Sequence, residues 1–360
     1  MLLLCCMLGL GKFRVKNFAI HTIESHISAL VSLLVVLVLA LIQLFYMPQN
    51  DYMLSAIISA TLFSVYQPRL FGKSINLKLI MGLIISLLLG VVVFLASYLY
   101  YLNFVGYTLV LVILLMLTCM SCCARLHISA GVWILTDIYI VFSGFSGDVI
   151  HALYTGVFAS LAGLLLVLVL WLKNFIFHPN RYRTMRKEVL FPKHSFHLSK
   201  GVLLYSLRLV VAVLCALIIS YYFDLFAGFW VPMTVFVVMK PSIHKTLNAL
   251  KHRLWGTIIG AMLALPIVLY IHSSIIILLI LLICIYGIVI TLAKHYGAYT
   301  FFLTLGVIIA PALGHYFSEK MLLEARVSAT FIGLVTVMVI VLFAYSPKAI
   351  KRLQNKYRAY

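Results

Sequence analysis

Acidic side chains are scarce in this sequence. Only 8 of its 360 residues are Asp or Glu, against 27 Lys or Arg, and charged residues make up 10% of the chain. The few acids are scattered, and neither an H-E-x-x-H motif nor a glycine-rich phosphate-binding loop is present. No Asp lies five residues after a His to make the acyltransferase pattern. These absences disfavour an enzyme that works through paired carboxylates or a carboxylate-rich metal site.

Cysteine does not form a metal or disulfide framework either. The seven cysteines lie in or beside apolar segments, where a free thiol behaves as a small hydrophobic side chain. The cluster "CMSCC" at residues 119–123 has no second ligand cluster, so packing is favoured over a metal or redox role. We therefore expect no cofactor, no metal and no catalytic residue.

Hydrophobic residues are what the chain has in abundance. They make up 65% of it, and apolar runs of about 17 to 25 residues, the length that crosses a bilayer as a helix, recur throughout. Unpaired backbone groups are costly in lipid, and the alternating pattern of a barrel is absent. The sequence predicts an all-α integral membrane protein in contact with the lipid bilayer.

Twelve spans are predicted, as six plus six. They cover residues 26–46, 52–67, 77–101, 106–124, 128–144, 150–173, 201–223, 228–240, 254–272, 274–293, 297–314 and 326–345. The two predicted six-helix bundles cover residues 26–173 and 201–345, and a basic linker covers residues 174–200 between them. An N-terminal segment covers residues 1–25, and a C-terminal tail covers residues 346–360. The cations of the N-terminal segment follow its apolar stretch, so we do not interpret it as a signal peptide.

The net charge of +19 gathers in loops on one side of these spans. Of the 27 Lys and Arg residues, all but Arg208, Lys320 and Arg326 fall there, and the positive-inside rule makes that side cytoplasmic. The orientation of the protein in the membrane explains this positive charge better than nucleic-acid binding does. We expect a multi-pass protein of a bacterial inner membrane with both termini in the cytoplasm.

The two bundles resemble each other in sequence. An offset of 173 residues pairs Asp51 with Asp224, Thr61 with Thr234, and Pro68 with Pro241. Small residues also recur at matching spacing in the helix after each proline: Gly82, Ser86 and Gly90 in the first copy, Gly256, Gly260 and Ala264 in the second. Six helices per copy is an even number, so the copies are predicted to be parallel repeats.

The second and eighth spans are short and occupy corresponding positions in the two copies. Paired short or interrupted helices point to a transport site, although tilted helices without a substrate role would give the same pattern. Pro241 ends the eighth span, and residues 242–252 have an apolar and a basic face. We therefore expect short interfacial helices after spans 2 and 8.

Several residues around this break have expected roles. Lys240 and Arg253 each adjoin a hydrophobic span, where a charge that faces lipid costs ~3 kcal/mol, so they are placed toward a watery vestibule that admits an anion. Gly256 and Gly260 are expected to pack against another helix, and Thr257 to satisfy a backbone carbonyl or line the path. Trp230 is expected to be an aromatic-belt anchor at the outer end of its span.

The same residues resemble the signature of the fusaric acid resistance (FUSC) family of bacterial inner-membrane exporters, which is distantly like the plant aluminium-activated malate transporters. The matching positions are Gly228, Phe229, Trp230, Thr234, Lys240, Pro241, Thr246, Arg253, Gly256, Thr257 and Gly260. A later element matches through Arg326, Thr330 and Gly333. The first copy departs from the pattern, with Ile57, Gln67 and Ile80 at the places of Trp230, Lys240 and Arg253. Within these 360 residues we expect no counterpart of the large cytoplasmic domain that many members carry.

The resemblance implies export of small organic or aromatic acids. The candidate anion-binding residues are Lys240, Arg253, Thr234, Thr257, Lys294, Arg326 and Arg208. Asp137 and Glu324 are the candidates for proton coupling, although a structural pair between Asp137 and an arginine would be equally compatible. An uptake carrier, an anion channel, a lipid-modifying enzyme and a structural membrane protein stay open as alternatives, as do a homodimer and an accessory periplasmic adaptor.

The sequence alone leads to one mutational prediction. Arg253→Ala and Lys240→Ala are expected to abolish anion movement while membrane insertion is kept, because they remove charge from the pathway without altering a span. Flux in liposomes measures this, and unchanged flux in both variants would remove these residues from the site.

Overall fold

The protein is described here from a computed structural model. It describes residues 30–42, 56–62, 75–121, 126–177, 199–271, 273–291, 295–310 and 319–344. These residues are helical apart from short connections, and none of them forms a strand. After helices over residues 30–42 and 56–62, the order is α4 (Ile75–Leu102), α5 (Phe104–Met120), α6 (Leu126–Phe142), η3 (Ser143–Phe145), α7 (Val149–Phe177), α8 (Lys200–Tyr222), α9 (Trp230–Val238), α10 (Ile243–Tyr270), α11 (Ser274–Thr291), α12 (Tyr296–Ile309) and α13 (Glu319–Ala344).

The predicted all-helical membrane fold is confirmed. Each predicted span overlaps one of these helices, and seven of the helices are long and apolar enough to cross a membrane by length and composition. Three shorter apolar helices, Leu30–Ile42, Phe104–Met120 and Tyr296–Ile309, accompany them. The chain is therefore a multi-pass membrane protein, and the number of twelve crossings stays a prediction.

The interfacial helix predicted after the eighth span is wrong as a separate element. Residues 243–252 are the first turns of α10, which runs without interruption for 28 residues. Its buried side chains form one continuous stripe, Thr246, Ala249, Arg253, Gly256, Thr257, Gly260, Ala261, Ala264 and Val268. This stripe keeps its helical spacing across residue 254, where the ninth span was predicted to begin. The polar side chains of residues 243–252 therefore lie on the same continuous helix as the apolar span that follows. The corresponding segment after the second span lies outside the described residues.

The short eighth span is confirmed. Helix α9 has 9 residues and all of them are buried. At about 1.5 Å per residue it is far shorter than the ~30 Å hydrocarbon core. Pro241 follows directly after the helix, where Lys240 is held by two hydrogen bonds: its N–H donates to Thr246 Oγ1 at 3.0 Å, and its carbonyl accepts from the same hydroxyl at 3.1 Å. The break is thus a fixed feature of the fold.

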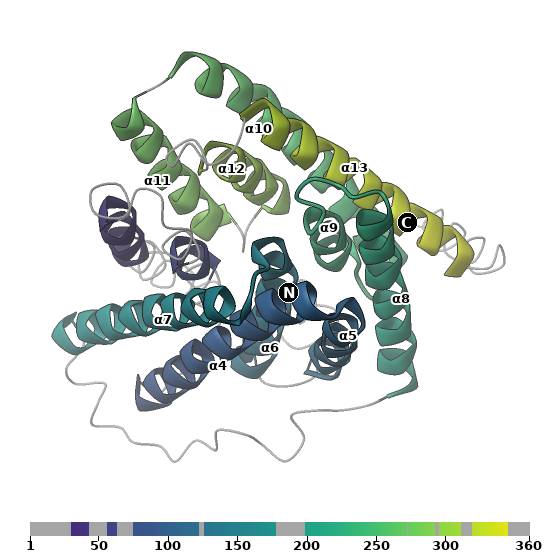
Figure 1. The fold of residues 1–360 in the computed structure, drawn as a ribbon, viewed down its shortest axis with the longest axis horizontal. Helices are drawn as coiled ribbons and strands as arrows, with labels where there is room; N and C mark the ends of the chain where they lie inside the picture. The colour runs from purple at the N-terminus through teal and green to yellow at the C-terminus, as the bar shows by residue number, and fades with distance from the viewer. Residues whose placement is uncertain are drawn as a thin grey trace, which may run out of the picture.

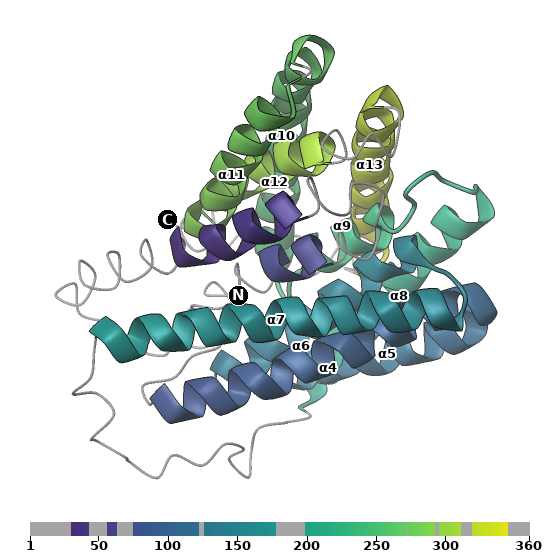
Figure 2. The ribbon, with the colours of Figure 1, turned by 60° about the vertical axis from the view of Figure 1, so that its left-hand side comes forward.

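Helices of the two predicted bundles meet along one seam. Helices α5 and α6 of the first contact α8 and α9 of the second, and α9 also packs against α13 and α10. Figure 1 shows α9 between α8, α12 and α13, and Figure 2 shows α4 and α7 side by side along their length. The seam therefore places α9 where both bundles reach it.

The small-residue stripes pack closely but against different partners. In the first bundle, a Cβ on Gly90 would lie 2.7 Å from the carbonyl oxygen of Gly156 on α7. In the second, a Cβ on Gly256 would lie 2.8 Å from the carbonyl oxygen of Gly297 on α12. These helices are the sixth and the eleventh of the predicted spans, so the two stripes do not pack equivalently, and the parallel repeat stays a prediction.

We expect Gly256→Ala to destabilise the protein. The added methyl group meets backbone that cannot rotate away, and overpacking of this kind typically costs about 1 to 3 kcal/mol. The thermal midpoint in detergent measures the effect. Met262→Ala on the same helix, where the side chain is 70% exposed, is the control and should change the midpoint little. Equal midpoints for the two variants would contradict the close packing of α10 on α12.

Candidate functional site

Three charged side chains are buried together where the bundles meet. Asp137 of α6 is 1% exposed, and Arg253 of α10 and Arg326 of α13 are 0% exposed. Among the described residues these are the only charged side chains that are buried. Asp137 interacts electrostatically with both arginines, and the two arginines interact with each other. We call these three residues the charge cluster.

The charge cluster has unused hydrogen-bonding capacity. Nε, Nη1 and Nη2 of both Arg253 and Arg326 are buried and have no hydrogen-bond partner among the described residues, and the same is true of Oδ1 of Asp137. A guanidinium carries five N–H donors, and buried donors that stay unpaired destabilise the fold. The arginines are therefore placed near the carboxylate without being saturated by it.

Aromatic side chains surround the arginines. The guanidinium carbon of Arg326 lies 4.8 Å from the ring centroid of Trp230, a cation–π arrangement. Tyr296 and Tyr299, in the first turn of α12, stack with centroids 5.9 Å apart and interact electrostatically with the charge cluster. The buried hydroxyl of Tyr296 lies close to the guanidinium group of Arg253, although neither group makes a hydrogen bond of good geometry with a described residue. The first turn of a helix adds partial positive charge.

Close helix packing fixes the geometry of the site. Thr300 of α12 donates through Oγ1 to the carbonyl of His252 at 3.1 Å, which anchors the start of α12 beside Arg253. On the other side, a Cβ on Gly333 of α13 would lie 3.0 Å from Cβ of Thr234 and 3.1 Å from the carbonyl oxygen of Val231. Because Gly333 has no side chain, α13 approaches α9 closely enough to lay Arg326 over Trp230.

The arrangement is suited to holding an anion. Two guanidinium groups and one carboxylate leave one net positive charge in a buried, aromatic setting. Guanidinium forks bind carboxylates with two parallel hydrogen bonds, and buried charges require such partners. Among the described residues no group of three or more His, Cys, Asp or Glu could hold a metal ion.

Arg253, Arg326 and Asp137 were all candidates from sequence, and the structure brings them together. Trp230 joins them, and its interpretation as a lipid-facing belt anchor is wrong, because the side chain is 6% exposed and lies over Arg326. Thr234 is buried on α9, and its hydroxyl has no hydrogen-bond partner among the residues that the structure describes. Thr257, on α10, accepts a hydrogen bond from Thr304 at 3.5 Å.

Other candidates lie elsewhere. Lys240 is half-buried at the break between α9 and α10, Arg208 is half-buried on α8, and Glu324 is exposed on α13. None of these three is among the buried charges, and their proposed roles stay predictions. Gly256 and Gly260 face α12, as expected for packing residues. Lys294 and Pro68 lie outside the described residues.

Two site residues were missed by the sequence reasoning. Tyr296 and Tyr299 occur as a pair three residues apart, which places both on one helical face at the start of the eleventh span. That spacing was an available signal. Although the first copy departs from the family pattern, the first bundle contributes Asp137 to the charge cluster.

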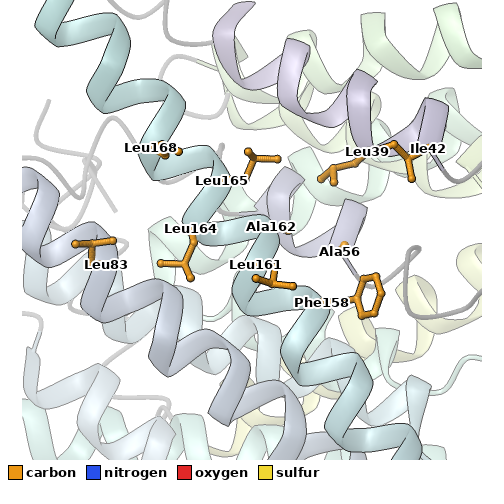
Figure 3. Close-up of a pocket in the computed structure, with 10 residues that line it drawn as sticks. All are labelled: Leu39, Ile42, Ala56, Leu83, Phe158, Leu161, Ala162, Leu164, Leu165 and Leu168. Carbon is orange, nitrogen blue, oxygen red and sulfur yellow. The ribbon is translucent and has the colours of Figure 1, made fainter.

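An apolar groove lies apart from the charge cluster. It has a volume of 630 Å³ and is lined by side chains from the first bundle: Leu39, Ile42, Ala56, Leu83, Phe158, Leu161, Ala162, Leu164, Leu165 and Leu168 (Figure 3). No polar side chain and no member of the charge cluster lines it. The groove therefore lacks the chemistry to recognise an anion.

Comparison with known proteins bears on the second bundle. Residues 214–341 match the family described as "Fusaric acid resistance protein-like". The chain is also 27% identical over 140 residues to a protein of Synechocystis described as uncharacterized. That match covers 39% of this chain and 18% of the relative's length. No solved structure matches the chain.

We expect Trp230 and Trp255 to differ in their access to lipid. Trp230 is 6% exposed, whereas Trp255 on α10 is 56% exposed. In single-tryptophan variants, with the other three tryptophans replaced by phenylalanine, brominated lipids should quench the fluorescence of Trp255 much more than that of Trp230. Equal quenching would contradict the buried position of Trp230 over Arg326.

Proposed function

We propose, from the premise that residues 214–341 form a fusaric acid resistance protein-like domain, that this chain is a membrane transporter that exports small organic or aromatic acid anions. One observation carries the proposal: two buried arginines share a single carboxylate, and none of their side-chain nitrogens has a hydrogen-bond partner among the described residues. A carboxylate ligand would supply the missing acceptors.

The position of the charge cluster supports movement of this ligand through the protein. Intramembrane charges that face the interior of a bundle mark ion and substrate pathways. The short helix α9 ends in the break at Pro241 and begins beside the cluster with Trp230, and interrupted helices are typical of transport sites. A site between helices of two bundles is also one that relative movement of the bundles can open.

The aromatic surroundings support an aromatic or otherwise apolar acid. Trp230, Tyr296 and Tyr299 offer ring faces beside the guanidinium groups, and their hydroxyl and indole groups add donors. A ligand with a ring and a carboxylate would use both kinds of contact. Benzoate is the simplest probe of this class.

Export fits the electrical driving force. A bacterial membrane is negative inside, and each 100 mV is worth about 2.3 kcal/mol for one charge, roughly a 50-fold concentration ratio. That force moves a single anion outward without a coupled ion. A bacterial inner membrane with both termini in the cytoplasm is part of the same proposal. Export of this kind is compatible with a homodimer or with an accessory periplasmic adaptor, and it requires neither.

We expect Arg253→Gln and Arg326→Gln to weaken benzoate binding and transport. Losing one charge-assisted hydrogen bond costs about 1.5 to 3 kcal/mol, which corresponds to roughly a tenfold to hundredfold loss in affinity. Efflux of labelled benzoate from proteoliposomes, with an imposed potential, measures transport. Lys251→Gln is the matched control, because it removes the same charge from an exposed position two residues earlier on α10.

Two results would count against this proposal. One is a wild-type protein that moves none of a panel of aromatic and aliphatic carboxylates in proteoliposomes. The other is benzoate efflux that the two arginine variants retain at the rate of Lys251→Gln. In cells, deletion of the gene is expected to increase sensitivity to at least one such acid.

A further inference from the structure

We propose that Asp137 sets the valence of the transported anion, so that the site takes a singly charged carboxylate and rejects a doubly charged one. This inference rests on the proposed function and adds the charge class of the substrate. It assigns Asp137 as a residue that determines specificity.

The first step is a charge count at the site. With both arginines protonated and Asp137 ionised, the state addressed by an assay near pH 8, Arg253 and Arg326 contribute two positive charges and Asp137 contributes one negative charge. The neighbours that interact with them, Trp230, Tyr296 and Tyr299, are uncharged at neutral pH. The empty site therefore carries one net positive charge, and one monoanion makes it neutral.

The second step is the cost of net charge in a buried site. Charges removed from water are stabilised only by close opposite charges, and the penalty rises steeply as net charge accumulates. A monoanion brings the site to zero, whereas a dianion brings it to one net negative charge beside the Asp137 carboxylate. At a few ångströms two carboxylates repel each other appreciably even where the effective dielectric constant is about 20. The site therefore discriminates by valence.

The third step is that Asp137 acts through its charge, without using up the hydrogen-bond donors of the two guanidinium groups. Its carboxylate interacts electrostatically with both guanidinium groups, yet their Nε, Nη1 and Nη2 atoms have no hydrogen-bond partner in the part of the chain that the structure describes. The donors stay available to a ligand while the negative charge is already present. An aspartate that only satisfied the arginines would be hydrogen-bonded to them.

Replacing this carboxylate by an amide should reverse the preference. In Asp137→Asn the empty site carries two net positive charges, and a dianion now makes it neutral. Benzoate and phthalate are the probes, because they share a ring and differ by one carboxylate. Near pH 8 both are fully ionised. We expect the ratio of phthalate to benzoate efflux from proteoliposomes to rise roughly tenfold or more over wild type, which corresponds to about 1.4 kcal/mol.

Three comparisons make the test specific. Asp148→Asn makes the same chemical change at an exposed position just before α7 and should leave the ratio at the wild-type value. Asp137→Glu keeps the charge and should keep the preference for benzoate. In detergent, phthalate should raise the thermal midpoint of Asp137→Asn more than benzoate does, with the reverse order for wild type, which reports binding without transport.

The outcomes separate this inference from the function on which it rests. If wild type moves neither probe nor any other carboxylate, the proposed function fails and this inference fails with it. If wild type moves benzoate and Asp137→Asn keeps the same ratio, the valence role alone is overturned. The same holds if a folded Asp137→Asn moves neither probe, because the aspartate would then be required for movement itself.

Discussion

The organisation of this protein depends on burying two guanidinium groups inside an apolar helical membrane protein. Arg253 and Arg326 are fully enclosed, and among the described residues only Asp137 brings them an opposite charge. Hydrocarbon cannot solvate such groups, so the surrounding helices must exclude lipid and present polar or aromatic surface to them. The rings of Trp230, Tyr296 and Tyr299 do this, and five helices (α6, α9, α10, α12 and α13) converge to supply these rings and the charges.

Close approach of helices makes this convergence achievable. The face of α10 that carries Arg253 also carries Gly256 and Gly260, which lie against backbone atoms of α12. Gly333 plays the same part between α13 and α9. In a membrane, where hydrophobic burial does not drive helices together, such contacts and the hydrogen bonds of threonine hydroxyls supply much of the attraction. The residues that hold the helices together are therefore neighbours of those that create the site.

Sequence reasoning succeeded where a local pattern has one physical meaning. Long apolar runs specified helices, the pair Lys240 and Pro241 specified a break, and the glycines of α10 specified a packing face. It failed where the outcome depends on tertiary neighbours. Residues 243–252 could lie on an interface or continue a span, and only the packing against α12 and α13 decides between these. Trp230 at a span end looks like a belt anchor until α13 covers it, and no spacing links Asp137 to arginines more than 100 residues away.

The packing of the second bundle divides the site between two tightly joined helix pairs. Arg326 and Trp230 belong to α13 and α9, which touch through Gly333, while Arg253, Tyr296 and Tyr299 belong to α10 and α12, which touch through Gly256 and Gly260. Within each pair, backbone contacts leave little freedom for independent sliding. The two pairs also contact each other, through α10 and α13 and through α12 and α13. An anion held by both arginines would therefore act as a removable tie across helices that already pack together.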